Sequence, residues 1–338
     1  MTDRLGVAVV GCGLIGRRRA AVAAREPRSR CVVVSDLSPE AARTAAAESG
    51  AAVEVDWKKA VVRPDVGAVV VATPNGFLAD IAVHALEAGK HVLVEKPMGR
   101  NLAEAERMRD AARRSGRVLK VGFNHRYHPA ISEARRRLDV GEIGGVINVR
   151  CRYGHGGRAG YESEWRGSRE LAGGGELTDQ GVHVVDLIHW FVGVPETAFA
   201  MVQTAVWPLG DLEDNAFGLF RYASGVVASF HTSWTQWKNL FSFEVFGHDG
   251  ALGVEGLGRS YGPETLTVHT RRPEGGVPLI ETVAYEGEDP SWELEWKDFL
   301  GATLDGRAML GCADEGVVAM RMLRALYQSA ASGVPVRV

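Results

Sequence analysis

The strongest constraint on the fold of this chain is a regular alternation, over its first third, of short apolar runs with alanine-rich segments. The apolar runs are rich in β-branched residues and have the length of strands rather than of helices. Continuous apolar strands separated by helices are typical of a parallel sheet covered on both faces. The sequence therefore predicts a doubly wound α/β domain over residues 1–123. Its predicted strands are residues 5–11, 29–36, 52–56, 68–73, 91–96 and 118–123.

The rhythm changes after Phe123, which predicts a second domain over residues 124–338. A helix at 129–139 and a strand at 146–154 lead into a loop rich in Gly and Arg, and then into another helix. Beyond Gly193, strand-like runs follow one another without helices between them, which predicts an antiparallel meander. These runs are residues 196–207, 214–222, 225–235, 241–247, 251–256, 264–270 and 280–287. Helices predicted at 292–304 and 313–330 close the chain, and we expect that they can pack back on the first domain.

The charge balance argues against large polyanionic partners. With 39 Lys and Arg against 42 Asp and Glu, the formal net charge is −3, so no overall field draws the protein to nucleic acid or to an anionic membrane. The cysteines are scattered without a C-x-x-C pair, which is typical of a reducing compartment and argues against a structural zinc site. The apolar segment 5–16 has its basic cluster behind it, the wrong order for an export signal. We expect a cytoplasmic protein.

A glycine-rich turn follows the first predicted strand, and it indicates a dinucleotide site. The pattern G-x-G-x-x-G is weak alone, but here it joins a strand to a helix, and Asp36 stands 20 positions after Gly16 at the end of the second strand. The pyrophosphate would lie at the helix N-terminus and Asp36 would accept hydrogen bonds from the ribose hydroxyls. Asp36 would repel a 2′-phosphate and Leu37 offers no cation, so NAD is favoured over NADP. A tight turn with no ligand is the alternative. The predicted contacts are Gly11, Gly13, Leu14, Ile15, Gly16 and Asp36.

Two further features lie near this predicted site. Arg17 to Arg19 follow the turn; they could contact the pyrophosphate, but the composition favours ordinary solvated basic residues. Lys96 ends the strand HVLVEK, and ligands of parallel sheets bind at that edge. Lys96 would then face the cofactor, although a surface lysine at a strand end fits the spacing as well.

The stretch GGGELTDQGVH, residues 173–183, carries the strongest indication of catalysis. If residues 178–191 form a helix, Asp179, His183 and Asp186 share one stripe, and the three glycines let the helix start lie against a bound ligand. Asp179 could orient the His183 imidazole and favour its protonated form, which suits acid–base work on a hydroxyl. The alternative is a helix cap beside a buried core histidine. No third ligand accompanies His183 and Asp186, so we expect no metal site.

These motifs together resemble the glucose-fructose oxidoreductase / inositol dehydrogenase / rhizopine catabolism (Gfo/Idh/MocA) family. The resemblance rests on GCGLIG, VVVATPN, AGKHVLVEKPM and GGGELTDQGVH in that order, and it covers essentially the whole chain. It implies an N-terminal Rossmann domain, a C-terminal α/β domain with a large open, mostly antiparallel sheet, and a nicotinamide cofactor. It also implies that Lys96, Asp179 and His183 are catalytic, with His183 the general acid–base. The same resemblance assigns Thr73, Pro74, Asn75 and Glu95, besides Lys96, to the nicotinamide half of the cofactor.

The substrate site is predicted from the segments around these motifs. NHRYHP and RYGHGGRAGYESEWRG are rich in aromatic, His and Arg groups, which stack on sugar rings and bind hydroxyls or anionic substituents. We predict an NAD-dependent oxidoreductase acting on a sugar, cyclitol or nucleotide-sugar, with a non-catalytic dinucleotide sensor as the alternative. One face of the long meander lacks covering helices, so we expect a homodimer or homotetramer. The predicted substrate contacts are Lys96, Asn124, Arg126, Tyr153, His155, Arg158, Tyr161, Trp165, Arg166, Asp179 and His183.

Overall fold

The chain forms two compact units in a computed structural model that describes residues 4–338. Unit 1 comprises residues 4–123 together with Glu170–Gly173 and Trp292–Met320. Unit 2 comprises Asn124–Arg169, Gly174–Ser291 and Arg321–Val338.

Unit 1 is built on a parallel sheet of six strands within the described residues, in the order β3-β2-β1-β4-β5-β6. The order reverses between β1 and β4, which is the crevice where open α/β sheets bind their ligands. The doubly wound fold predicted from the sequence is confirmed. The strands are β1 (Leu5–Val10), β2 (Ser29–Ser35), β3 (Ala52–Val53), β4 (Ala68–Val71), β5 (His91–Val94) and β6 (Leu119–Val121).

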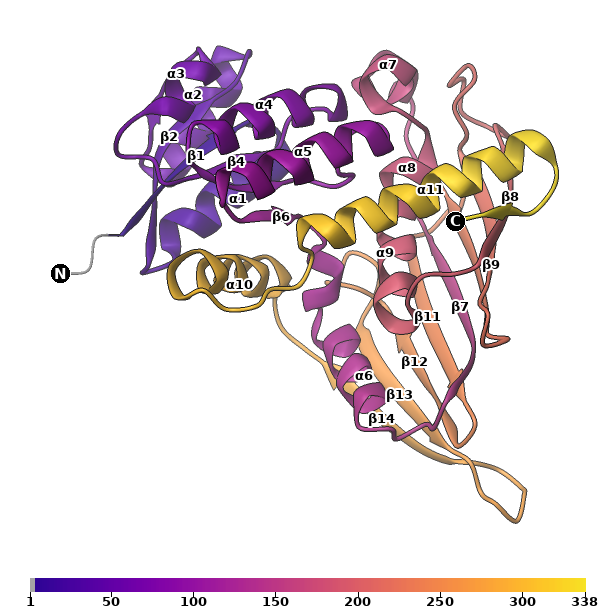
Figure 1. Cartoon of the computed structure of the whole chain (residues 1–338). Helices are drawn as coiled ribbons and strands as arrows, with labels where there is room; N and C mark the ends of the chain where they lie inside the picture. The colour runs from indigo at the N-terminus through magenta and orange to yellow at the C-terminus, as the bar shows by residue number, and fades with distance from the viewer. Residues whose placement is uncertain (1–3) are drawn as a thin grey trace. The chain divides into compact units, whose positions relative to one another are not determined.

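The helices of unit 1 begin and end at recognisable local signals. Ser38 caps α2 by accepting a hydrogen bond from the Ala41 N–H, and Gly50 ends that helix in the left-handed conformation. Asn101 and Gly116 do the same for α5, which lies beside α4 in Figure 1. The helices are α1 (Leu14–Arg25), α2 (Pro39–Ser49), α3 (Trp57–Val62), α4 (Asn75–Glu87), α5 (Leu102–Ser115) and α10 (Ser291–Asp305).

Helix α10 supplies part of the core of unit 1, although it lies far along the chain. Trp296, Phe299 and Leu300 are buried in one cluster with β1 residues such as Val7 and Val9. The Trp296 indole N–H also donates to the Ser29 hydroxyl at 3.0 Å, so this large side chain is buried without an unsatisfied donor.

Unit 2 is built on a sheet of nine strands, in the order β14-β13-β12-β11-β7-β10-β9-β8-β15. The predicted meander is wrong in one respect: β7 lies between β10 and β11, parallel to β10 and antiparallel to β11. Alternating apolar residues indicate a strand but not the strand with which it pairs, because the pattern is the same whichever neighbour the strand has. The strands are β7 (Val146–Gly154), β8 (Thr197–Gln203), β9 (Asn215–Arg221), β10 (Val227–Ser233), β11 (Leu240–Gly247), β12 (Gly250–Glu255), β13 (Glu264–Thr270), β14 (Leu279–Tyr285) and β15 (Val336–Arg337).

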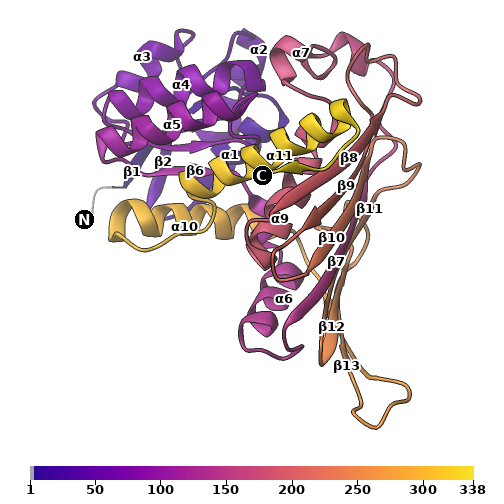
Figure 2. The ribbon, with the colours of Figure 1, turned by 45° about the vertical axis from the view of Figure 1, so that its right-hand side comes forward.

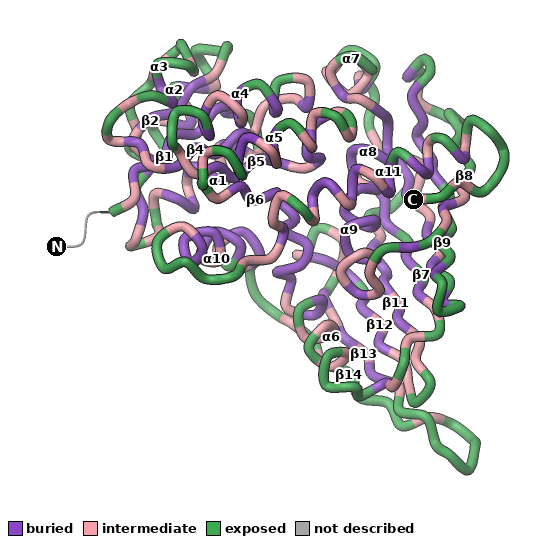
Figure 3. Tube along the Cα trace, in the orientation of Figure 1, coloured by how far each residue is buried: buried purple, intermediate pink, exposed green. Residues whose placement is uncertain are grey.

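Helices cover only one face of this sheet. Figure 2 shows α6 and α9 on the same side of the strands. Helix α9 is buried along most of its length, whereas the turn between β13 and β14 is exposed (Figure 3). The remaining helices of the chain are η1 (Asn124–Tyr127), α6 (Pro129–Asp139), η2 (Tyr161–Ser163), η3 (Trp165–Gly167), α7 (Arg169–Ala172), α8 (Glu176–Asp179), α9 (Gly181–Val192) and α11 (Ala313–Ser332).

From residue 4 onward, none of the helices is both long enough and apolar enough to cross a lipid bilayer.

Burial predicts different costs for the same substitution at two positions of this sheet. Leu266 on β13 is fully buried, whereas Leu279 on the adjacent β14 is 56% exposed. Leu266→Ala should lower the free energy of unfolding by about 2–5 kcal/mol, because it leaves a cavity in the core. Leu279→Ala should change it by less than about 1 kcal/mol. Urea denaturation followed by circular dichroism measures both, and equal losses would contradict this difference in burial.

Candidate active site

The glycine-rich turn between β1 and α1 has the shape of a dinucleotide site. Gly11 has φ +92°, and a Cβ there would lie 2.5 Å from the Ala72 carbonyl oxygen; a Cβ on Gly16 would lie 1.8 Å from the Gly11 oxygen. Gly13 differs, because a Cβ there meets no described atom within 4 Å and no side chain caps the start of α1. The turn therefore presents the first N–H groups of α1, beginning at Leu14 and Ile15, to an anion.

Asp36 is held beside this turn by two backbone donors. One carboxylate oxygen accepts from the Cys12 N–H at 2.6 Å and the other from the Ser38 N–H at 2.7 Å. Each oxygen retains a lone pair for a ribose hydroxyl. The next side chain, Leu37, is 85% exposed and offers no cation to a 2′-phosphate.

The other predicted cofactor residues follow β4 and β5 at the carboxyl edge of the same sheet. Thr73 Oγ1 is buried and has no hydrogen-bond partner within residues 4–338, which is the kind of group that a ligand satisfies. Pro74 precedes α4, and Asn75 begins this helix and donates from Nδ2 to the Ala172 carbonyl at 2.9 Å. Lys96 is half-buried directly after Glu95, and its peptide bond to Pro97 is cis.

Glu95 is held in place by Arg19, a residue that the sequence composition wrongly predicted to be solvated. Arg19, expected to be solvated, is 1% exposed, and its Nε donates to Glu95 Oε1 at 2.7 Å while Nη1 donates to Glu295. Burial by itself lowers the pKa of Arg19, but the carboxylates of Glu295 and Glu95 outweigh burial and raise it. The indole ring of Trp292 covers the guanidinium at 4.5 Å. Arg17 does lie at the surface, paired with Glu48.

The three glycines at 173–175 are explained by neighbouring parts of the protein itself. A Cβ on Gly173 would lie 2.6 Å from the Arg100 carbonyl oxygen, and φ there is +84°. A Cβ on Gly174 would lie 2.3 Å from the Tyr327 hydroxyl, and one on Gly175 would lie 2.2 Å from the Glu213 carbonyl oxygen. The expectation that a bound ligand presses on these glycines is therefore not needed, because main chain and buried side chains already fill the space.

The helix predicted at 178–191 is interrupted. Helix α8 ends at Asp179, and α9 begins at Gly181 after Gln180, whose φ is −105°. His183 therefore lies in the first turn of α9, and it is 5% exposed. Asp179, 8% exposed, accepts a hydrogen bond from Arg166 Nε at 2.9 Å. The Asp179 carboxylate in turn raises the pKa of Arg166.

A ring of polar and aromatic groups surrounds these residues within unit 2. Burial lowers the pKa of His155, although the nearby Asp179 carboxylate opposes this shift. Burial raises the pKa of Tyr153, which forms a side-chain hydrogen bond with Tyr261. Trp165 lies against the Arg166 guanidinium, 4.4 Å from its ring centre. Arg166, Tyr153 and His155 thus lie in one cluster with Asp179 and His183, and their contact with a substrate stays a prediction.

Other predicted substrate contacts have protein partners that give them structural roles. Arg126 is fully buried and forms two hydrogen bonds to Asp186, at 2.8 and 2.6 Å. Tyr161 packs edge-on against Trp234, with ring centres 5.0 Å apart, in a small apolar cluster. These contacts hold Arg126 and Tyr161 in place, and their contact with a substrate stays a prediction.

Two more of the predicted contacts are also engaged by the protein. Arg158 pairs with Glu164 at the surface, and its side chain is 61% exposed. Asn124 is 6% exposed and donates from Nδ2 to the Ser291 hydroxyl at 3.1 Å. These contacts fix Asn124, whereas the exposed Arg158 keeps the freedom to meet a ligand.

Sequence reasoning missed three residues of this region. His125 stacks on His183, Tyr261 contacts Tyr153, and Glu213 accepts hydrogen bonds from the Gly175 and Leu177 N–H groups at 3.0 Å each. Of these three, only His125 could have been found from the sequence, because it stands in the NHRYHP segment that was assigned to the substrate site. In the part of the chain that the structure describes, no group of three or more His, Cys, Asp or Glu is placed to hold a metal ion.

Comparison with known proteins identifies the family. Residues 5–123 match the family model described as an oxidoreductase family with an NAD-binding Rossmann fold, and residues 131–253 match the GFO/IDH/MocA C-terminal domain. The chain belongs to the Gfo/Idh/MocA oxidoreductase family. The resemblance inferred from the motifs is confirmed, and with it the assignment as an oxidoreductase.

Two relatives in this family are named for sugar substrates. The chain is 30% identical to levoglucosan dehydrogenase of Pseudarthrobacter phenanthrenivorans, over 74% of this chain and 73% of that protein. It is 32% identical to 1,5-anhydro-D-fructose reductase of Ensifer adhaerens, over 82% of this chain and 84% of that protein. Among solved structures, levoglucosan dehydrogenase in complex with NADH superposes with a TM-score of 0.91 at 27% identity and covers 99% of both chains.

The tight packing around the glycines of this Gfo/Idh/MocA member yields a stability test. Gly174→Ala should lower the free energy of unfolding by about 1–3 kcal/mol, because the added Cβ overpacks against Thr178 and Tyr327. Gly145→Ala is the matched control, since the nearest atom to its added Cβ is a ring carbon of His248 at 3.5 Å. Thermal denaturation of both variants measures the difference. Equal midpoints would show that the protein around Gly174 yields without cost.

Proposed function

We propose that this protein transfers a hydride between NAD and a secondary alcohol or ketone of a sugar, cyclitol or nucleotide-sugar. The observation that carries the proposal is the buried polar cluster around His183, in a chain of a family whose relatives are sugar and inositol dehydrogenases and reductases. A buried imidazole among polar groups that can bind hydroxyls is suited to proton transfer at a carbinol.

The residues at the glycine-rich turn fit NAD. Gly13 leaves open space for the close approach of a pyrophosphate, Asp36 is oriented for a ribose, and the buried hydroxyl of Thr73 is available. When bound, NAD⁺ supplies the acceptor for the hydride that leaves the substrate carbon. NAD is preferred over NADP because the Asp36 carboxylate repels a 2′-phosphate.

Three residues are proposed to act on the carbinol. His183 takes the hydroxyl proton as the carbon loses its hydride, so the alcohol becomes a ketone; in the reverse direction His183 returns the proton. Asp179 stabilises the protonated imidazole electrostatically. Lys96 is proposed as the third catalytic residue, because a lysine ammonium can stabilise negative charge that develops on a substrate oxygen.

The substrate class follows from the groups gathered near His183. Trp165 offers an aromatic face for the apolar side of a sugar ring, and His155 and Arg166 offer polar contacts to its hydroxyls. Arg158 is exposed and can meet an anionic substituent, which keeps sugar acids and nucleotide-sugars among the substrates to be tested.

A substrate screen tests the proposal directly. Purified protein should reduce NAD⁺, read by absorbance at the nicotinamide band, with at least one member of a panel of levoglucosan, 1,5-anhydrohexitols, free hexoses, inositols and nucleotide-sugars. NADP⁺ run in parallel should be the poorer acceptor. Binding of the dinucleotide without turnover of any panel member would favour a sensor instead.

With the substrate in hand, His183→Ala should lower kcat by a factor of about 10² to 10⁴, because proton transfer loses its acceptor. The dissociation constant for NAD⁺, measured by fluorescence, should change little. His248→Ala is the matched control, since His248 is an exposed histidine in the turn before β12. Normal turnover by His183→Ala would disprove the assignment of the general base.

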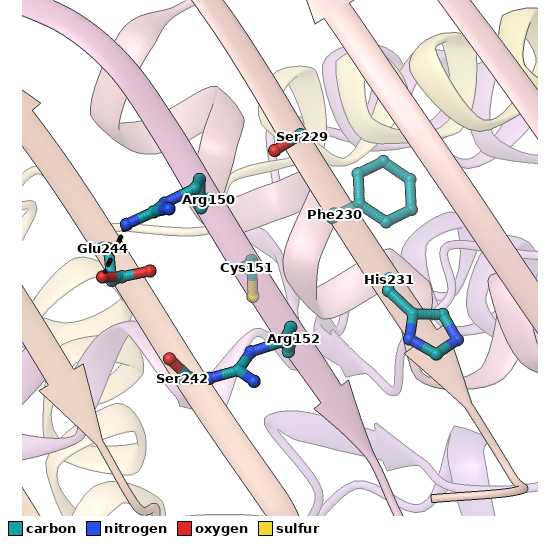
Figure 4. A pocket seen from close by; sticks show the side chains of 8 residues that line it. All are labelled: Arg150, Cys151, Arg152, Ser229, Phe230, His231, Ser242 and Glu244. Carbon is teal, nitrogen blue, oxygen red and sulfur yellow. Dashed lines mark hydrogen bonds and ion pairs between the residues drawn. The ribbon is translucent and has the colours of Figure 1, made fainter.

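We also propose that the protein is a homo-oligomer that uses the uncovered face of the unit 2 sheet. Met201, Phe217 and Leu219 are 63%, 45% and 45% exposed on this face. Beside them lies a hollow of about 600 Å³ in which Arg150 pairs with Glu244 at 3.1 Å (Figure 4). Apolar side chains together with both signs of charge make this face complementary to a second copy of itself.

Light scattering coupled to size exclusion should therefore report a dimer or tetramer. Phe217→Lys should shift the mass toward the monomer, because it places a charge in the apolar patch. Phe77→Lys is the control, with a similar exposure of 44% in α4. A monomeric wild type, or an unchanged mass in Phe217→Lys, would contradict this interface.

A cytoplasmic location is the remaining part of the proposal. All four cysteines are free, and Cys12, Cys31 and Cys151 are buried as thiols, which suits a reducing compartment.

A further inference from the structure

The imidazole rings of His125 and His183 are stacked face to face. Their centroids are 3.7 Å apart and the planes differ by 15°. Each residue is only 5% exposed, so the contact is shielded from solvent. One face of the proposed general base is therefore covered by a second titratable ring.

The ring of His125 is itself enclosed. Tyr153 of β7 meets it edge-on at 5.3 Å, Phe241 of β11 at 6.1 Å, and His128 at 5.7 Å. The His125 ring has little room to rotate among these neighbours. A histidine ring otherwise rotates broadly about χ2, so a fixed partner on one face restricts the plane of His183.

A buried ion pair sets the spacing of the two segments that carry the rings. Arg126, the residue after His125, forms two hydrogen bonds to Asp186, which lies one helical turn beyond His183 on α9. Both side chains are 0% exposed. Because η1 is tied to α9 at this point, the adjacent residues meet at stacking distance.

The stack also affects how readily the two imidazole rings take up protons. Two imidazolium rings at 3.7 Å repel each other strongly in a buried site, so the pair takes up one proton far more readily than a second. Other titratable groups also lie around the stack. Tyr153 is kept neutral because burial raises its pKa, His128 is engaged by Glu264 at 3.1 Å, and Asp186 is neutralised by Arg126. In addition to burial, the carboxylates of Glu176 and Asp179 on α8 raise the pKa of both Tyr153 and Tyr261. Asp179 is paired with Arg166.

We propose that His125 is a positioning residue for His183, which holds the plane of the imidazole by stacking and limits the two rings to one shared positive charge. The inference rests on the proposed role of His183 as general base. A base must be neutral to accept the hydroxyl proton, and its nitrogen must point at that proton. The stack serves both requirements.

Nuclear magnetic resonance titration of the full chain tests the shared charge without any substrate. In protein labelled at histidine ring carbons, signals of the two rings are assigned with His125→Phe and His183→Phe, which keep an aromatic ring in place. The ring that takes up its proton second in the wild type should titrate at a higher pH, by at least about one unit, once the other ring cannot be charged. His248→Phe is the control and should leave both midpoints unchanged. Unchanged midpoints in both stack variants would overturn the proposal.

Kinetics with the substrate found by the screen test the positioning. His125→Leu, which removes the stacked ring, should lower kcat by about 10- to 100-fold while the KM for NAD⁺ stays within about threefold. His125→Phe, which retains a ring, should lose less of kcat than His125→Leu and should shift the acid limb of the pH profile. If His125→Leu folds normally and keeps the wild-type kcat, the positioning role is wrong. In that case a loss of activity in His183→Ala would still support His183 as the general base. The two proposals can therefore be disproved independently.

Discussion

The buried pair of Arg126 and Asp186 is the interaction on which the geometry of unit 2 depends. Both side chains are fully buried, and two hydrogen bonds join them. Removing two charges from water is expensive, and a buried pair is tolerated only when its hydrogen bonds are well made. Loss of either partner would leave an uncompensated charge inside the unit, so the pair strongly specifies how η1 meets α9. His125 and His183 take their relative positions from this contact.

Unit 1 contains a comparable arrangement at the other group of proposed functional residues. Arg19 is enclosed between Glu95 and Glu295, and Trp292 covers its guanidinium. Glu95 immediately precedes Lys96, so the ionic contact fixes the main chain from which the proposed catalytic lysine projects. In both units a buried arginine orients the segment next to a proposed catalytic residue. Rigid support of this kind preorganises a site, since a small displacement of a reacting group costs much of the rate.

Most of the individual elements could be predicted from the sequence. The helix at Pro129–Asp139 and the strand at Val146–Gly154 were predicted with the bounds that the structure has, because apolar periodicity and local stop signals determine them. The place of β7 between β10 and β11 could not be predicted, since strands far apart in the sequence pair through tertiary contacts. The break at Gln180 was also missed, because apolar periodicity continues through it. The N–H groups of the preceding turn donate hydrogen bonds to Glu213, a residue distant in the sequence.

The sequence by itself determined the family, the doubly wound domain and the chemistry available to the protein. Those properties reside in motifs of a few neighbouring residues, such as the glycine turn with Asp36, and local geometry suffices to interpret them. Only the tertiary structure decided which polar side chains support the fold and which line the proposed site. Arg126 and Arg166 look equivalent in the sequence, yet one is enclosed with Asp186 and the other is paired with Asp179 beside His183. The difference arises because burial and charge pairing depend on residues brought together from distant parts of the chain, and no local pattern encodes those neighbours.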